Sequence, residues 1–190
     1  IYSAIASALG SLKGPKHGGA NLKVMEMMDE IKREVKHWDN DWEVRDYLAK
    51  ILNREAYDRT GLIYGLGHAV YTLSDPRCVL LKKKASQLAK DKGRMDEYQL
   101  YESVERIGPA VFNEMKNTNK PMCANVDFYS GFVYDMLNIP IDLYTPLFAI
   151  ARAVGFCAHI IEENINGGRI IRPAYKNVRD RMDYVPLDQR

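Results

Sequence analysis

Apolar residues recur along most of this chain at the three- and four-residue intervals of an α-helix. Side chains with that spacing share one helix face and can bury it against a neighbour. We expect helices over residues 21–36, 42–54, 75–91, 96–117, 125–137 and 145–163, after an opening segment, residues 1–9, that has the pattern of a helix entered part-way. The sequence therefore predicts a mainly α fold, and the missing lead-in predicts that the chain is part of a longer one.

Local chemistry marks several helix ends. Pro76 suits the first position of a helix because its ring presets the backbone angle φ. Asn125 and Thr145 are expected N-caps, whose side chains accept a hydrogen bond from the first turn. The pair Gly108-Pro109 predicts an interruption of the helix around it, because proline lacks the backbone N–H.

Two stretches lack the helical period. Residues 63–71 combine β-branched and aromatic residues with glycines, which predicts either a short strand pair or a rigid loop. The tail after Gly167 is polar and rich in arginine, and a short strand over residues 169–172 is the one regular element expected there.

Composition narrows the function classes. With 190 residues, 46% hydrophobic and 27% charged, the chain can bury a sizeable core in one or two domains. Its net charge of +2 gives no reason to expect a nucleic-acid partner. No run approaches the roughly 18 consecutive apolar residues of a membrane span, so no membrane partner is expected.

The three cysteines, Cys78, Cys123 and Cys157, are odd in number and show no CxxC spacing. This pattern argues against a disulfide framework and against a structural zinc site. We expect three small buried side chains in a protein of the reducing cytoplasm. The sequence after His159 is not HExxH, so no metal site is expected.

Two histidines lie among glycines in stretches that are not helical. His17 lies in GPKHGGAN, directly before an expected helix, and a neutral imidazole there can donate a hydrogen bond to a developing oxyanion. His68 lies in GLGHAVY, whose glycines lack the offset of a dinucleotide fingerprint. For each, the alternative is a histidine that only fills a turn.

One aspartate and three arginines complete the candidates. Asp127 is expected in the first turn of a helix capped by Asn125, where the helix dipole favours an ionised carboxylate that can act as a base. Arg77 is expected in another first turn, where the dipole opposes a cation unless an anion is bound. Arg152 and Arg172 are flanked in the sequence by apolar residues. Arginine grips carboxylates with paired hydrogen bonds, so the set indicates a small anionic carbonyl substrate, with ordinary ion pairs as the alternative.

Other motifs are weaker. Ser130 is not part of a GxSxG elbow, so a hydrolase triad is not expected. The run Lys82-Lys83-Lys84 is typical of a solvated helix face, and phosphate binding is its alternative.

Five motifs, taken together and in order, resemble citrate synthases: GPKHGGAN, GLGHAVYTLSDPR, NVDFYSG, AIARAVGFCAHIIEE and GGRIIRP. The resemblance implies a multi-helical citrate synthase-like fold. It implies an enzyme of the tricarboxylic acid cycle that condenses oxaloacetate with acetyl-CoA as co-substrate and holds no permanent cofactor. It also implies that residues 18–135 form the small domain and that residues 1–17 and 136–190 belong to the large domain.

The resemblance assigns roles residue by residue. It implies that His17 supports the enol of acetyl-CoA, that His68 polarises the oxaloacetate carbonyl and that Asp127 removes the methyl proton. The carboxylate-binding arginines of the family are matched by Arg77, Arg152 and Arg172, the last of which reaches the partner's site in the family's homodimer. The loop that recognises CoA is matched by Gly65, Leu66, Gly67, Ala69 and Val70, together with Asn125.

The chain departs from the family pattern at some points. Ala69 and Thr72 stand where a number of relatives carry cations, which leaves the CoA phosphates to nearby lysines. The family's N-terminal half is absent from this sequence, which predicts that the chain alone is inactive. Two alternatives stay open: a methylcitrate synthase, which takes propionyl-CoA, and a non-catalytic module that binds CoA or a partner.

Overall fold

A computed structural model describes residues 1–14, 18–170, 172, 174, 176 and 178–190. The α-helices of this described part are α1 (Tyr2–Leu12), α2 (Ala20–Glu34), α3 (Asp41–Leu52), α4 (Pro76–Lys92), α5 (Met95–Lys116), α6 (Val126–Met136) and α7 (Tyr144–Asn166), with short 3-10 helices at Ile141–Leu143 and Leu187–Gln189. The same residues contain no β-strand, only an isolated antiparallel bridge between Leu66 and Ala124. The predicted mainly α fold is confirmed.

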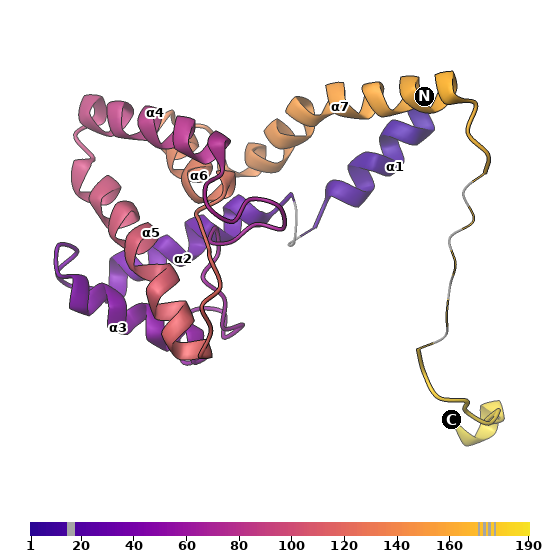
Figure 1. Ribbon diagram of the computed structural model, residues 1–190, viewed down its shortest axis with the longest axis horizontal. Coiled ribbons are helices and arrows are strands. Elements are labelled where there is room, and N and C mark those ends of the chain that lie inside the picture. Colours follow the sequence, from indigo (N-terminus) through magenta and orange to yellow (C-terminus); the bar gives the residue numbers. More distant parts are fainter. Residues whose placement is uncertain (15–17, 171, 173, 175, 177) are drawn as a thin grey trace.

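Helices α2 to α6 form one bundle, while α1 and α7 run side by side away from it and the tail after α7 extends further still (Figure 1). Within the bundle α4 packs on α6, α3 on α5, and α2 on α6. The buried core runs from Val24 to Met136 and therefore comes from the bundle alone. Its centre is aromatic, with the rings of Tyr101 and Phe132 stacked at 4.7 Å between centroids.

Two glycines set how closely the elements approach. A Cβ at Gly131 in α6 would lie 2.5 Å from Cγ of Met25 in α2, so only glycine allows these two helices to pack this tightly. A Cβ at Gly108 in α5 would overlap the side chain of Leu66, which belongs to the loop between α3 and α4. Gly108 therefore makes room for that loop on the side of α5.

Several local predictions need correction. Helix α5 continues through Pro109 without a break. Helix α7 begins at Tyr144, and Thr145 does not cap it, because the Thr145 hydroxyl instead donates to the Gly18 carbonyl at 2.8 Å. Of the two alternatives predicted for residues 63–71, the structure has the loop and not the strand pair. In the tail, residues 169, 170 and 172 belong to no strand, and position 171 is outside the described residues.

The cysteines differ from one another. Cys78 is buried, Cys123 is half-buried and Cys157 is exposed on α7, so the expectation of three buried thiols is wrong for Cys157. All three are free thiols, in agreement with the cysteine pattern, which argues against a disulfide framework.

One segment, Ile141–Asn166, is long and apolar enough to cross a membrane, with a hydropathy of 1.4. Core helices of larger proteins pass the same test of length and composition. Only 6% of the apolar window is buried here, so most of α7 has no cover within the described part of this chain.

Candidate active site

The imidazole of His68 is oriented by its own loop. Its Nδ1 accepts hydrogen bonds from the backbone N–H groups of Val70 at 3.0 Å and Tyr71 at 3.1 Å. A neutral ring whose Nδ1 is an acceptor carries its proton on Nε2. The loop therefore presents Nε2–H as a donor, and the ring is steadied by Tyr71, whose centroid lies 4.8 Å away.

Arg77 stands next to that donor. Its Nη2 lies 3.3 Å from Nε2 of His68. A guanidinium can only donate hydrogen bonds, and an Nε2 that carries a proton cannot accept one. No hydrogen bond therefore forms between the two side chains in this tautomer of His68. Both groups are donors that lie 3.3 Å apart, so one oxygen of a ligand, a carbonyl or a carboxylate, can accept from both.

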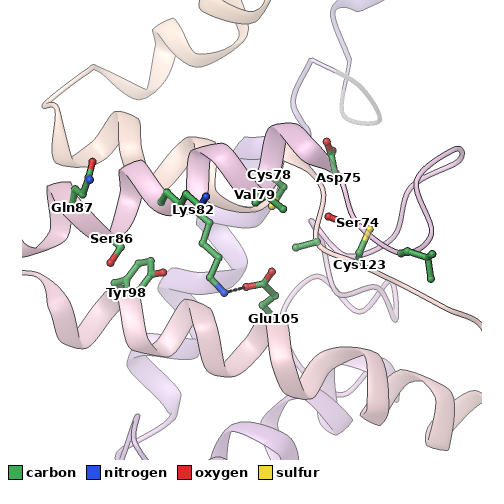
Figure 2. Close-up of a pocket in the computed structure, with 13 residues that line it drawn as sticks. Ser74, Asp75, Cys78, Val79, Lys82, Ser86, Gln87, Tyr98, Glu105 and Cys123 are labelled. Atoms are coloured by element: carbon green, nitrogen blue, oxygen red, sulfur yellow. Dashed lines mark hydrogen bonds and ion pairs between the residues drawn. The ribbon is translucent and has the colours of Figure 1, made fainter.

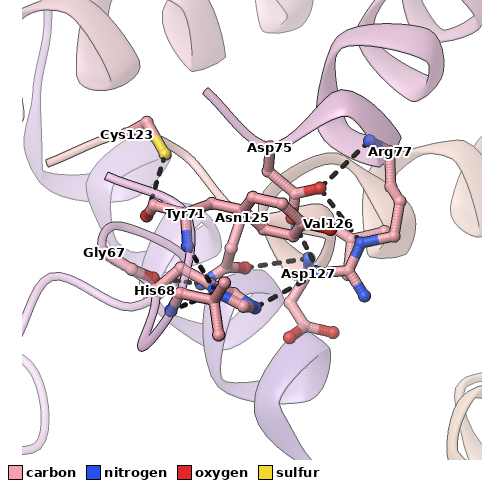
Figure 3. A network of polar contacts seen from close by, with 10 residues as sticks. Gly67, His68, Tyr71, Asp75, Arg77, Cys123, Asn125, Val126 and Asp127 are labelled. Atoms are coloured by element: carbon pink, nitrogen blue, oxygen red, sulfur yellow. Dashed lines mark hydrogen bonds and ion pairs between the residues drawn. The ribbon is translucent and has the colours of Figure 1, made fainter. Parts of the chain in front are cut away.

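Asp75 holds the guanidinium in place. Its carboxylate accepts from Arg77 Nε at 3.0 Å and from Nη2 at 2.8 Å, the paired geometry that arginine favours (Figure 3). The hydrogen bonds that Arg77 donates to Asp75 raise the pKa of Arg77 above its ordinary value. The side chain of Arg77 is still 45% exposed, so it can reach a ligand while Asp75 anchors it.

The Asp75 carboxylate is itself buried, with 1% of the residue exposed. Burial alone would raise its pKa, but the hydrogen bonds and charge of Arg77 outweigh burial and keep the pKa of Asp75 below its ordinary value. The sequence predicts Asp75 only as the start of the helix expected over residues 75–91. The sequence feature that indicates a further role for Asp75 is Arg77, two positions later, because the first turn of a helix disfavours a cation that lacks an anionic partner.

Asp127 lies at the start of α6. The N-cap Asn125 accepts a hydrogen bond from the Asp127 backbone N–H at 2.9 Å, so the predicted cap and the predicted first-turn position are both confirmed. The helix dipole at this end favours the carboxylate form. Asp127 is half-buried and close enough to Arg77 for the two charges to interact. Figure 3 draws His68, Arg77 and Asp127 in one network.

The glycine loop and the start of α6 are joined by the backbone. Asn125 donates from its backbone N–H to the Gly65 carbonyl and from its side chain to the Gly67 carbonyl, both at 2.9 Å. Gly67 donates to the Cys123 carbonyl at 2.7 Å. Both glycines have positive φ, +81° and +90°, which lets the loop double back on itself next to His68.

The remaining predicted residues lie elsewhere. His17 falls outside the described residues. Arg152 is exposed on α7, with its guanidinium 5.3 Å from the centre of the Phe148 ring, and Arg172 is exposed in the tail. Because α7 and the tail leave the bundle (Figure 1), this chain brings His68, Arg77 and Asp127 together but not Arg152 or Arg172.

A cavity of about 410 Å³ adjoins the glycine loop. Loop residues Leu66, Gly67, His68 and Ala69 form one wall, while Phe112, Lys120 and Met122 contribute to the other. Val70, also predicted to contact CoA, is exposed beside it. The cavity combines apolar and aromatic walls with one cation, which suits a flat ring linked to an anionic group.

A second cavity, of about 590 Å³, lies along α4 and α5 (Figure 2). Lys82 at its edge is paired with Glu105 at 2.7 Å, so this lysine is not the free cation that a phosphate site needs. Burial raises the pKa of the Cys78 thiol to about 12, which leaves no thiolate for nucleophilic chemistry. This cavity shares Asp75 and Cys123 with the network of Figure 3.

Comparison with known proteins gives a consistent result. The family model described as citrate synthase, C-terminal domain, matches residues 1–174. The citrate synthase of Haloferax volcanii is 36% identical over 191 residues, which cover 100% of this chain and 45% of that protein. The 2-methylcitrate synthase 1 of Corynebacterium glutamicum is 38% identical, over 100% of this chain and 44% of that protein.

A solved structure agrees with the fold. Citrate synthase from Thermoplasma acidophilum, solved as a ternary complex with carboxymethyl coenzyme A and oxaloacetate, matches with a TM-score of 0.74 at 33% identity, over 100% of this chain and 46% of that one. The chain thus spans about half the length of the relatives it matches. The family model covers nearly all of the chain, and the chain therefore belongs to the citrate synthase family.

Proposed function

We propose that this chain works as the C-terminal part of a citrate synthase, which condenses oxaloacetate with acetyl-CoA to give citrate and CoA. The observation that carries the proposal is the donor pair of His68 Nε2 and Arg77 Nη2, 3.3 Å apart, with Asp127 interacting with the same arginine. The ternary complex of the Thermoplasma relative, with carboxymethyl coenzyme A and oxaloacetate, supports the two substrate classes.

Oxaloacetate would lie against the donor pair. His68 would donate to its carbonyl oxygen and make the carbonyl carbon a better electrophile, while Arg77 would bind a carboxylate. Arg152 and Arg172 would bind further carboxylate oxygens, Arg172 from the partner subunit of a homodimer. Holding the carbonyl in one orientation replaces a bimolecular encounter by a pre-arranged one.

Acetyl-CoA would be activated by a base and a donor acting together. Its methyl proton is weakly acidic, so removal by Asp127 requires that the oxygen of the forming enolate be stabilised at the same moment, the role proposed for His17. The enol carbon then attacks the oxaloacetate carbonyl, and hydrolysis of the citryl thioester releases CoA.

CoA would be recognised mainly by the glycine loop. The carbonyls of Gly65 and Gly67 accept hydrogen bonds from Asn125, so these glycines would shape the loop. Leu66, Ala69 and Val70, together with Asn125, would contact the adenine of CoA. Lys120 borders the adjoining 410 Å³ cavity and is a suitable cation for the CoA phosphates, because Ala69 and Thr72 supply none.

The assembly proposed here has two levels. Residues 18–135 form the small domain, and residues 1–17 and 136–190 join the large domain, whose other part comes from the N-terminal half of the same protein. The buried core inside residues 24–136 supports this division. We place the homodimer in the cytoplasm and its reaction in the tricarboxylic acid cycle.

A second function is favoured by one observation. A 2-methylcitrate synthase is 38% identical to this chain, as similar as several citrate synthases are. That relative's name makes propionyl-CoA the competing acyl substrate. A non-catalytic CoA-binding module remains a third hypothesis for the 190-residue chain by itself.

The test is a condensation assay on the parent polypeptide, meaning this chain joined to the N-terminal half of its own protein. Acetyl-CoA and propionyl-CoA are compared at saturating oxaloacetate. We expect faster turnover with acetyl-CoA and none from the 190-residue chain alone, because half of the proposed substrate shell is missing from it. Preference for propionyl-CoA would favour the methylcitrate synthase, and no turnover with either would refute both.

A further inference from the structure

One buried carboxylate serves two elements that are far apart in the sequence. Asp75 Oδ1 accepts from the Arg77 backbone N–H and from Arg77 Nε, each at 3.0 Å. Its Oδ2 accepts from Arg77 Nη2 at 2.8 Å and from the backbone N–H of Val126 at 3.2 Å. Val126 is the first residue of α6, so Asp75 joins the start of α4 to the start of α6.

Both oxygens are needed for this arrangement. A carboxylate offers about four acceptor positions, and Asp75 fills four of them with Arg77 and Val126. A buried charge is tolerated where it is fully hydrogen-bonded, which is the case here. Any movement of Arg77 relative to α6 would leave one of these donors or the carboxylate without its partner, so Asp75 fixes the distance between them.

We propose that Asp75 is a positioning residue that sets Arg77, on the oxaloacetate side of the site, against the start of the helix that carries Asp127. It touches neither substrate. It acts through the guanidinium on one side and through the Val126 N–H on the other. The inference rests on the proposed function only for what Arg77 and Asp127 do, not for the geometry that joins them.

Two substitutions separate its two contacts. Asp75→Asn keeps a side chain that can still cap α4 but removes the charge and the paired acceptor for Arg77. Val126→Pro removes the N–H that Asp75 accepts from α6 and leaves the helix start intact, because proline suits the first helical position and the extended Asn125 before it (ψ 176°) permits it. The control is Asn40→Ala, which removes the side-chain cap of α3 in another part of the bundle.

The variants are compared in the parent polypeptide by oxaloacetate affinity and by deuterium exchange at the methyl of a non-cleavable acetyl-CoA analogue. Asp75→Asn should weaken oxaloacetate binding and, at saturating oxaloacetate, slow the exchange, each by about tenfold or more. Val126→Pro should slow the exchange and leave oxaloacetate affinity unchanged. Asn40→Ala should lower stability and change neither.

A second measurement needs no catalysis. In the 190-residue chain, amide hydrogen exchange at Val126 should accelerate by about fivefold or more in Asp75→Asn, because a charged acceptor is lost, while Trp42, bonded to Asn40, stays unchanged. Unchanged exchange at Val126 would overturn the link to α6. An Asp75→Asn parent enzyme that loses only stability, or only one of the two functions, would overturn the joint role. Failure of the unsubstituted parent to form citrate would instead count against the proposed function.

Discussion

The donor pair at the centre of the site depends on what each side chain does with its other atoms. His68 can offer Nε2–H because two backbone amides occupy Nδ1, and Arg77 can offer Nη2 because Asp75 restrains the rest of its guanidinium. Two donors held 3.3 Å apart are prepared for an acceptor before it arrives. Such preorganisation is the main way in which a site stabilises developing charge.

The role of Asp127 can be tested by removing only its basicity. Asp127→Asn keeps the shape of the residue but cannot take a proton, so we expect turnover of the parent polypeptide to fall by about 10²- to 10⁴-fold, with oxaloacetate affinity retained. Steady-state kinetics and methyl deuterium exchange measure the two effects. Asp96→Asn is the matched control, because Asp96 is the second residue of α5 as Asp127 is of α6. Near-normal exchange in Asp127→Asn would mean that another carboxylate is the base.

The conformation of Gly65 can be tested in the 190-residue chain. Gly65→Ala would place a methyl group 2.7 Å from Cδ2 of Phe128 at a φ of +81°, so it meets both a clash and backbone strain. We expect the free energy of unfolding to fall by about 2–4 kcal/mol in urea titration. Gly93→Ala is the control, since Gly93 has a φ of +68° and open space around it, and it should cost about 1 kcal/mol. Equal losses would show that the contact with Phe128 does not matter.

Residues whose role is local were predictable, and residues whose role depends on a distant partner were not. Asn125 and Asp127 were placed correctly because an N-cap and a first turn are read from neighbouring positions. Thr145 was misplaced because its hydroxyl bonds to Gly18, 127 positions away. The hydrogen bond from Val126 to Asp75 joins residues 51 positions apart, and the sequence around neither residue predicts it.

Among the helices, ion pairs supplement the apolar core. Arg94, directly before α5, pairs with Glu97 in the same helix and with Asp135 in α6, and Glu97 also pairs with Lys32 in α2. The Arg94 hydrogen bond is the largest cause that lowers the pKa of Glu97, with Lys32 adding to it against the effect of burial. This network ties three helices together at one end of the bundle.

The network predicts a pH dependence of stability. Because folding lowers the pKa of Glu97, its contribution is present above the ordinary glutamate pKa and is lost as the pH falls through the folded-state pKa. Glu97→Gln should lower the free energy of unfolding by about 1–2 kcal/mol at pH 7, and the difference from the unsubstituted chain should shrink towards pH 3. Urea titration across this range measures it.

Glu114→Gln is the control for this experiment. Glu114 pairs with Arg45 at 2.7 Å, but its side chain is 61% exposed, and exposed pairs contribute little. Its substitution should leave the unfolding free energy nearly unchanged at both ends of the pH range. A loss from Glu97→Gln that did not depend on pH would contradict the electrostatic explanation.

Element positions could be predicted from periodicity more reliably than element interruptions. The helices found in the bundle agree with the expected ranges to within a few residues, because buried positions repeat at the helical spacing. Pro109 did not break α5, since the buried neighbours Ile107 and Val111 hold both sides of it in the core. Here packing outweighed the local preference, which no pattern around Pro109 could reveal.

At the scale of the whole molecule, the chain carries apolar surface that it does not cover. Ile150, Val154, Ile161 and Ile165 on α7 are all more than half exposed, with Val154 at 78%. Apolar patches of this kind mark surfaces that meet another protein segment. The family relation predicts such a surface, because the chain spans about half of its relatives' length, but the sequence alone could not give its extent.

This surface predicts self-association of the 190-residue chain. We expect a dimer or larger species by light scattering at tens of micromolar, roughly the range in which exposed apolar surface associates. Val154→Lys should weaken the association by placing a charge on the apolar face of α7. Leu73→Lys, which changes a still more exposed apolar residue in the loop before α4, should not. A monomer in the unsubstituted chain would contradict the prediction.

The side-by-side course of α1 and α7 has a consequence for how the bundle could be handled as a unit. The chain enters the bundle after Leu12 and leaves it before Tyr144. The hydrogen bond from Thr145 to Gly18 holds these two connecting segments together. The bundle is therefore inserted into a helical hairpin, with its entry and exit at one place. Such an insertion could be exchanged between relatives as a cassette through only two junctions, without rebuilding the hairpin that receives it.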